Sequence, residues 1–69
     1  MTTVVKVLEL VGESKQSFED AIENAVAEAS RNVSNITGVE VYNFTGDVQD
    51  GKIVDYKANV KVAYAAYKS

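Results

Sequence analysis

The side chains able to do chemistry in this sequence are carboxylates, lysines and tyrosines. The 69 residues include no Cys and no His, so a thiol nucleophile, a histidine general base and the Cys/His ligands of zinc and iron–sulfur sites are all missing. Asp47, Asp50 and Asp55 lie close together in the sequence. Their oxygens could hold a hard cation such as Ca²⁺, but carboxylates at a turn and at strand edges are the more ordinary interpretation, and we assign no metal ligands.

Lys57 could serve as a desolvated amine in a small enzyme that also uses carboxylates. No neighbouring residue in the sequence indicates a substrate, however, and a solvated or ion-paired strand lysine is the simpler explanation. We therefore predict that the chain is not an enzyme. Tyr56, Tyr64 and Tyr67 recur along one segment, and we expect them to pack in the core or at a strand end.

The size and charge of the chain limit what it can bind. Residues 1–69 suffice for a single domain, which at this size buries only about 60% of the surface of its unfolded chain. Without Cys it has no disulfides to strengthen it, which leaves association with other chains. The net charge of −3 argues against nucleic acid. No apolar run reaches the roughly 20 residues of a membrane span and no signal peptide is evident, so we expect no membrane contact and a cytoplasmic location.

The first elements that must position these residues are a strand and a helix. Residues 3–11 are rich in β-branched side chains and predict a strand that Gly12 ends. Ser17 followed by acidic residues resembles a capping box, so a helix should begin at Phe18. It should run for about 18 residues and end around Asn35 to Gly38. Its apolar face is Ala21, Ile22, Ala25, Val26, Ala29, Val33 and Ile36, at spacings of three and four.

Two further strands are predicted over residues 39–49 and 52–67. Asp50-Gly51 between them is a strong hairpin signal that suits a type I′ turn. Apolar residues at every second position from Val54 onwards indicate one apolar face on the last strand. The predicted fold class is therefore α+β, with the order β-α-β-β and a three-stranded antiparallel sheet packed on one helix.

A two-residue turn at Asp50-Gly51 also predicts the register of the hairpin, because paired residue numbers then sum to 101. On the face assigned to the helix, Asn43, Val41 and Val39 should oppose Ala58, Val60 and Val62. On the other face, Gly38, Glu40, Tyr42 and Phe44 should oppose Ala63, Lys61, Asn59 and Lys57. The Glu40–Lys61 charge pair supports this register.

The face without the helix carries Tyr42 and Phe44 and cannot be covered by the same helix. The last strand extends roughly 50 Å at ~3.3 Å per residue, whereas the helix spans only about 27 Å at ~1.5 Å per residue. A single chain would leave apolar sheet and unpaired strand edges in water. A bent strand with two surface aromatics is the alternative, but we favour assembly of the chain into a closed homo-oligomer.

The whole chain resembles the dodecins, small flavin-binding proteins that assemble as hollow dodecameric shells. The opening strand and its ending are similar to those of the family, as are the Ala-rich helix and the features of the two long strands. These segments are Val7-Leu8-Glu9-Leu10-Val11-Gly12-Glu13-Ser14, Ala21-Ile22-Glu23-Asn24-Ala25-Val26, Val39-Glu40-Val41, Gly46, Asp50-Gly51 and Lys61-Val62-Ala63-Tyr64. The resemblance implies a homo-oligomer, expected to be a dodecamer, that binds FMN or riboflavin between subunits.

The sequence departs from the family at the positions that hold the ligand. Flavin-binding dodecins have a stacking Trp where this chain has Gly38, and a ring-bonding Gln where it has Lys57. Bacterial members often carry arginines, of the kind that meet phosphate, where this chain has Thr45 and Ala65. The resemblance thus marks Gly38, Thr45, Lys57 and Ala65 as ligand positions. Two aromatic residues, Tyr42 and Phe44, could replace the stacking platform, or could pack at a subunit interface.

The sequence supports a non-enzymatic dodecin-like homo-oligomer that binds or stores a small ligand, with flavin the first candidate and its binding weakened. The alternative is a structural or Ca²⁺-holding assembly that has lost flavin binding. The sequence does not identify the physiological ligand, the exact subunit number or any partner protein.

Overall fold

The computed structural model describes residues 2–68, and within them the side chains of residues 4–66. The elements are β1 (Thr2–Ser14), α1 (Phe18–Asn32), β2 (Ile36–Gln49) and β3 (Lys52–Lys68). β3 is the central strand and pairs antiparallel with β1 on one side and β2 on the other. The predicted β-α-β-β order with a three-stranded antiparallel sheet and one helix is confirmed.

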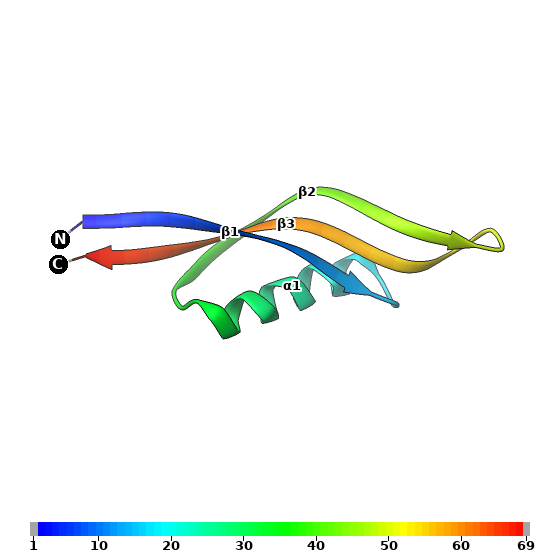
Figure 1. Cartoon of the computed structure of the whole chain (residues 1–69), viewed down its shortest axis with the longest axis horizontal. Coiled ribbons are helices and arrows are strands. Elements are labelled where there is room, and N and C mark those ends of the chain that lie inside the picture. Colours follow the sequence, from blue (N-terminus) through cyan, green and yellow to red (C-terminus); the bar gives the residue numbers. More distant parts are fainter. Residues whose placement is uncertain (1, 69) are drawn as a thin grey trace.

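The helix covers only the middle of a long sheet, as the strand and helix lengths predict. The chain measures 55 × 19 × 13 Å, and α1 lies against one face with the sheet extending beyond both of its ends (Figure 1). Val60 and Val62 of β3 are fully buried beneath the helix. No helix within residues 2–68 is long and apolar enough to cross a membrane.

The helix approaches the sheet closely because both surfaces are built from small residues. Ala21, Ala25 and Ala29 form its buried stripe. A Cβ atom at Gly12 would lie 1.9 Å from the carbonyl oxygen of Ala21 and 2.9 Å from the Cβ of Ala25. The prediction that Gly12 ends the first strand is wrong, since β1 continues to Ser14. The glycine instead makes room for the helix.

The sequence predicts the N-terminal end of α1 correctly, but not its C-terminal end. Ser17 is the N-cap, as predicted, and its hydroxyl accepts a hydrogen bond of 3.0 Å from the backbone N–H of Asp20. The helix ends at Asn32, earlier than predicted, because the next residue, Val33, is extended with φ of −137° and ψ of 156°. Asn35 then adopts a left-handed conformation with φ of 62° just before β2. Ile36, predicted to belong to the helix, is the first residue of β2 and packs against the core from there.

The hairpin is confirmed at its turn and in part of its register. Asp50 and Gly51 both have positive φ, at 54° and 76°, as a type I′ turn requires. The predicted pairs that the structure contains are Gln49–Lys52, Val41–Val60, Glu40–Lys61, Val39–Val62 and Gly38–Ala63.

Between these pairs the predicted register is wrong by one residue. A bulge that leaves Val54 unpaired shifts the strands, and a second bulge at Tyr42 restores the register. Each bulge inserts an extra residue in one strand only, so no residue count from the turn could foresee it. The observed pairs are Asn43–Asn59, Phe44–Ala58 and Thr45–Lys57, in place of Asn43–Ala58, Tyr42–Asn59 and Phe44–Lys57.

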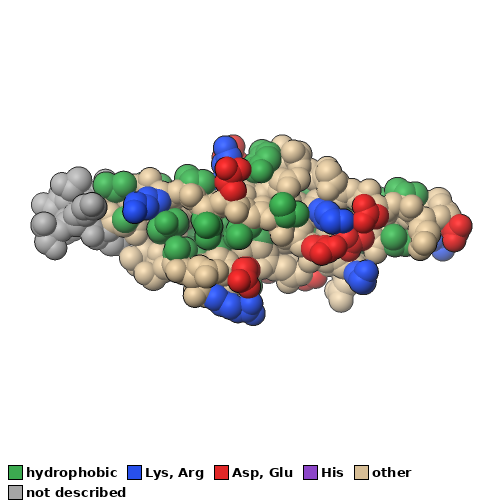
Figure 2. All heavy atoms as spheres, in the orientation of Figure 1, with side chains coloured by type: hydrophobic (Ala, Val, Ile, Leu, Met, Phe, Trp, Pro, Cys, Tyr) green, Lys and Arg blue, Asp and Glu red, His purple; other side chains and the backbone are tan. Residues whose placement is uncertain are grey.

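The opposite face of the sheet carries large apolar side chains without cover from the chain itself. Leu8 and Leu10 of β1 pack against the core, and the residues that alternate with them point the other way. Val5, Val7 and Val11 are 60%, 55% and 60% exposed. Figure 2 shows hydrophobic side chains along the middle of one face, with basic groups lying directly beside acidic ones.

Candidate functional site

The predicted ligand positions lie along two neighbouring strands rather than at one point. Gly38 pairs with Ala63, and Thr45 pairs with Lys57. Ala63 lies six positions after Lys57 on β3, roughly 20 Å at ~3.3 Å per residue. The two ends of this set are therefore far apart within one chain.

Gly38 offers open space on its strand. A Cβ atom built there would meet no atom within 4 Å, and its φ is not among the positive values of the chain. A large side chain at this position is therefore compatible with the fold. Neither the backbone nor the packing around this position requires glycine.

Phe44 lies on the other face from the one predicted. Because the bulges shift the register, it pairs with buried Ala58 and its ring meets Phe18 of the helix at a centroid distance of 4.9 Å. Phe18 is also 4.9 Å from the ring of Tyr56. Phe44 thus belongs to an aromatic cluster at the start of α1, although half of it remains exposed.

Tyr42 keeps its predicted place on the face away from the helix. Its hydroxyl is 3.3 Å from Glu9 Oε1, and the ammonium of Lys61 lies 5.5 Å from its ring centroid. The ring is about half exposed. Ala65 is buried, and its backbone N–H donates to the carbonyl oxygen of Asn35 at 2.9 Å.

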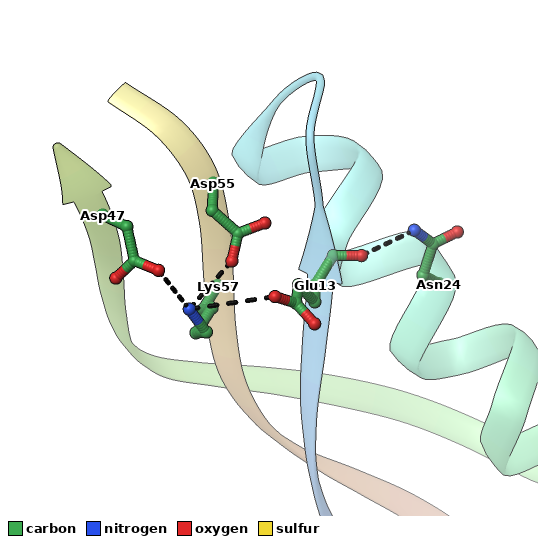
Figure 3. A network of polar contacts seen from close by, with 5 residues as sticks. All are labelled: Glu13, Asn24, Asp47, Asp55 and Lys57. Atoms are coloured by element: carbon green, nitrogen blue, oxygen red, sulfur yellow. Dashed lines mark hydrogen bonds and ion pairs between the residues drawn. The ribbon is translucent and has the colours of Figure 1, made fainter. Parts of the chain in front are cut away.

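Lys57 is held by three carboxylates from three strands (Figure 3). Its ammonium lies 2.8 Å from Asp55 Oδ2, 2.9 Å from Asp47 Oδ2 and 3.8 Å from Glu13 Oε2. Glu13 reaches it because β1 pairs with β3 in the register Glu13–Lys57. The side chain of Asp55 is only 8% exposed, whereas those of Asp47 and Glu13 are mostly open to water.

These contacts shift the protonation of the cluster. Hydrogen bonds from Lys57 to Asp55 and Asp47 hold the pKa of the lysine above its ordinary value. The neighbouring carboxyl of Glu13 and the hydrogen bond from Lys57 lower the pKa of Asp55, while the neighbouring carboxylate of Asp55, with its negative charge, raises the pKa of Glu13. Lys57 is therefore fixed as a cation, which is the opposite of what a nucleophilic amine needs.

The three aspartates considered as a calcium site do not form one set of ligands. Asp47 and Asp55 are cross-strand partners that share Lys57, and Asp50 lies in the hairpin turn. Among the residues that the structure describes, no group of three or more acidic side chains is arranged to hold a metal ion.

A polar depression at the β1–α1 junction escaped the sequence analysis. It has a volume of about 510 Å³ and is lined by residues 13–16 together with Asp20, Asn24 and Asp55. Ser14 Oγ donates to Asp20 Oδ2 at 2.7 Å, and the amide of Asn24 donates to the carbonyl oxygen of Glu13 at 2.9 Å. The depression depends on the pairing of β1 with β3, for which the sequence contains no local turn signal.

Comparisons with known proteins agree on one family. The family model described as Dodecin matches residues 4–66. No match was found among curated protein sequences. The chain is similar to a solved mutant of the Thermus thermophilus dodecin, at 27% identity over 97% of this chain and 100% of the other, with a TM-score of 0.91. It is also similar to the dodecin of Streptomyces coelicolor, at 27% identity over 97% and 96% of the chains and a TM-score of 0.88.

The description of a third similar structure names calcium. It is the calcium-chelating immunodominant antigen, calcium dodecin, of Mycobacterium tuberculosis. Its identity to this chain is 31%, the match covers 96% of this chain and 94% of the other, and the TM-score is 0.78.

Proposed function

The chain belongs to the dodecin family, whose members are non-enzymatic homododecamers that bind small ligands. From that premise we propose that it forms a dodecamer, with one domain of residues 1–69 in each subunit. A flavin is its first candidate ligand. The ligand would lie between subunits, on the sheet face away from the helix. Riboflavin and FMN are the two forms to consider.

The exposed apolar sheet face carries this proposal. Val5, Val7 and Val11 are each more than half exposed, and soluble monomers rarely leave a contiguous apolar surface of this kind open. β1 and β2 are also both edge strands, since β3 lies between them. Burial between copies of the chain would cover both the apolar face and the unpaired strand edges. It would also create a sheltered site for a flat ring.

Flavin binding would be weak in comparison with that of the family. A ring that stacks on an aromatic side chain gains about 1–3 kcal/mol by analogy with nucleic-acid platforms, and Gly38 supplies no such surface. Lys57 replaces a hydrogen-bonding amide by a cation whose charge is already engaged by Asp47 and Asp55. Tyr42, at the bulge and half exposed, is the remaining aromatic candidate on this face.

The first test is a fluorescence titration of riboflavin and FMN with the purified protein. We expect weak quenching for the natural chain and roughly 5- to 150-fold tighter binding for the variant Gly38→Trp, because the position is open and stacking contributes about 1–3 kcal/mol. Gly38→Leu is the matched control, which adds bulk without an aromatic ring. A Gly38→Trp variant that assembles but quenches no better than Gly38→Leu would contradict the proposed site.

A calcium-holding assembly is the second candidate, because a relative at 31% identity is described as a calcium dodecin. Here the sites would have to be completed between subunits, since no group of three acidic side chains within residues 2–68 of one chain suits a metal. Titration calorimetry with Ca²⁺ separates the two candidates. Saturable calcium binding without flavin quenching would favour this one.

A further inference from the structure

The depression at the β1–α1 junction contains a carboxylate oxygen with no hydrogen-bond donor. Asp55 forms part of its wall, and Oδ2 of this residue is engaged by Lys57. Oδ1 is buried and has no partner. Figure 3 shows it turned away from Lys57, towards β1. Buried polar atoms are nearly always paired, so a donor at this point would satisfy a group that the described residues leave unsatisfied.

The surroundings favour a positive charge on that donor. Three carboxylates line the depression, from Glu13, Asp20 and Asp55, against one lysine, Lys15. Asp55 is ionised beside Lys57, whose ammonium donates a hydrogen bond of 2.8 Å to its Oδ2. The side chain of Asp20 accepts its hydrogen bonds within the described residues from neutral groups, namely the hydroxyl of Ser14 and the side-chain amide of Asn24.

The size and geometry favour an organic cation over a metal ion. The volume of about 510 Å³ exceeds by far the ~30 Å³ that one water molecule occupies. The acidic groups are not arranged as a three-carboxylate metal site. A primary ammonium presents three N–H donors on a carbon chain, which suits scattered oxygen acceptors better than a single coordination centre would.

We propose that this depression binds a small hydrophilic molecule with primary ammonium groups, such as an aliphatic diamine, and that one ammonium donates a hydrogen bond to Asp55 Oδ1. The side chains of Lys15 and Gln16, both exposed, form the open side of the depression. Their rotamers exchange rapidly, so they admit the ligand without a change of the fold. This site adjoins the proposed flavin position Lys57, which Asp55 also contacts, but binding of the ammonium requires no flavin.

The test is titration calorimetry with 1,4-diaminobutane in about 0.15 M salt, where non-specific attraction to surface carboxylates is screened. We expect one saturable site per chain. Tetramethylammonium has the charge but no N–H donors, and should not bind. Asp55→Asn should weaken binding at least tenfold, whereas Asp50→Asn, the same change of charge at the exposed hairpin turn, should leave it unchanged.

A second variant keeps the test decisive if Asp55→Asn does not fold. Gln16→Lys places a tethered ammonium at the open side of the depression and keeps Asp55, so it should compete with the diamine and weaken its binding at least tenfold. The proposal is wrong if the natural chain shows no saturable heat, if tetramethylammonium binds as tightly as the diamine, or if Gln16→Lys binds the diamine unchanged. Flavin titrations of the Asp50→Asn and Gln16→Lys proteins should not change.

Discussion

Lys57 lies in a cluster with two of the aspartates that the sequence analysis had considered separately from it. The lysine and the aspartates were candidate catalytic or metal-binding groups, and the structure joins them with Glu13 into one ion-pair cluster. Lys57 already occupies an oxygen of Asp47 and one of Asp55, and these carboxylates favour the protonated lysine. The cluster therefore fixes the charge on this part of the sheet.

The pH dependence of stability follows from these shifts. The pKa of Asp55 is lowered in the folded chain, so its contribution is present above the ordinary aspartate pKa and is lost as the pH falls through the folded value. The pKa of Lys57 is raised, so its contribution is present below the ordinary lysine pKa and is lost only in strong alkali. Glu13 opposes them modestly, since its raised pKa favours the folded state below the ordinary glutamate pKa.

We predict that Lys57→Met lowers the urea midpoint of unfolding at pH 7, because Asp55 would be left as an unpaired buried carboxylate. The difference from the natural chain should shrink on acidification below the ordinary aspartate pKa, where the carboxylates become protonated. Lys61→Met is the matched control, since Lys61 lies on the same strand and face but contacts the Tyr42 ring instead. Equal losses for the two variants at pH 7 and at low pH would rule out the role assigned to the cluster.

At the scale of elements, several local signals in the sequence predicted the structure correctly, although those at Gly12 and at the end of the helix did not. The cap at Ser17, the alanine stripe and the Asp50-Gly51 turn each depend on residues close in sequence, and all three were predicted correctly. The bulges at Tyr42 and Val54 and the pairing of β1 with β3 depend on the assembled sheet. Those features decide which face Phe44 occupies and bring Glu13 to Lys57, and so the candidate site was predicted only in part.

Gly12 provides a direct test of the helix–sheet contact. We predict that Gly12→Ala destabilises the protein by about 1–3 kcal/mol or more, because its methyl group would overlap the backbone of Ala21. Gly38→Ala is the matched control. Nothing lies near its Cβ position, so this substitution should be neutral or stabilise by up to about 1 kcal/mol. Urea unfolding should be measured at one protein concentration, since the stability of an oligomer depends on it.

Equal stability of the Gly12→Ala and Gly38→Ala proteins would contradict the close approach of α1 to β1. A loss confined to Gly12→Ala would confirm that this glycine serves packing and not strand termination.

At the scale of the whole molecule, the sheet is too long for its helix. One face of the 55 Å chain packs on α1 over its middle, while the other face and both edge strands remain open. Sequence analysis predicted this imbalance from strand and helix lengths alone, because length follows directly from residue count. It could not predict how copies of the chain meet, since that depends on the shape that the bulges give to the sheet.

The most direct test of this account is native mass spectrometry of the purified protein at low micromolar concentration. We predict a closed assembly of twelve times the 7.5 kDa chain mass, the homododecamer of the family. Val7→Lys, which places charge on the exposed apolar face, should shift the population to smaller species. A folded 7.5 kDa monomer as the dominant species of the natural chain would contradict the claim that copies of the chain cover this face.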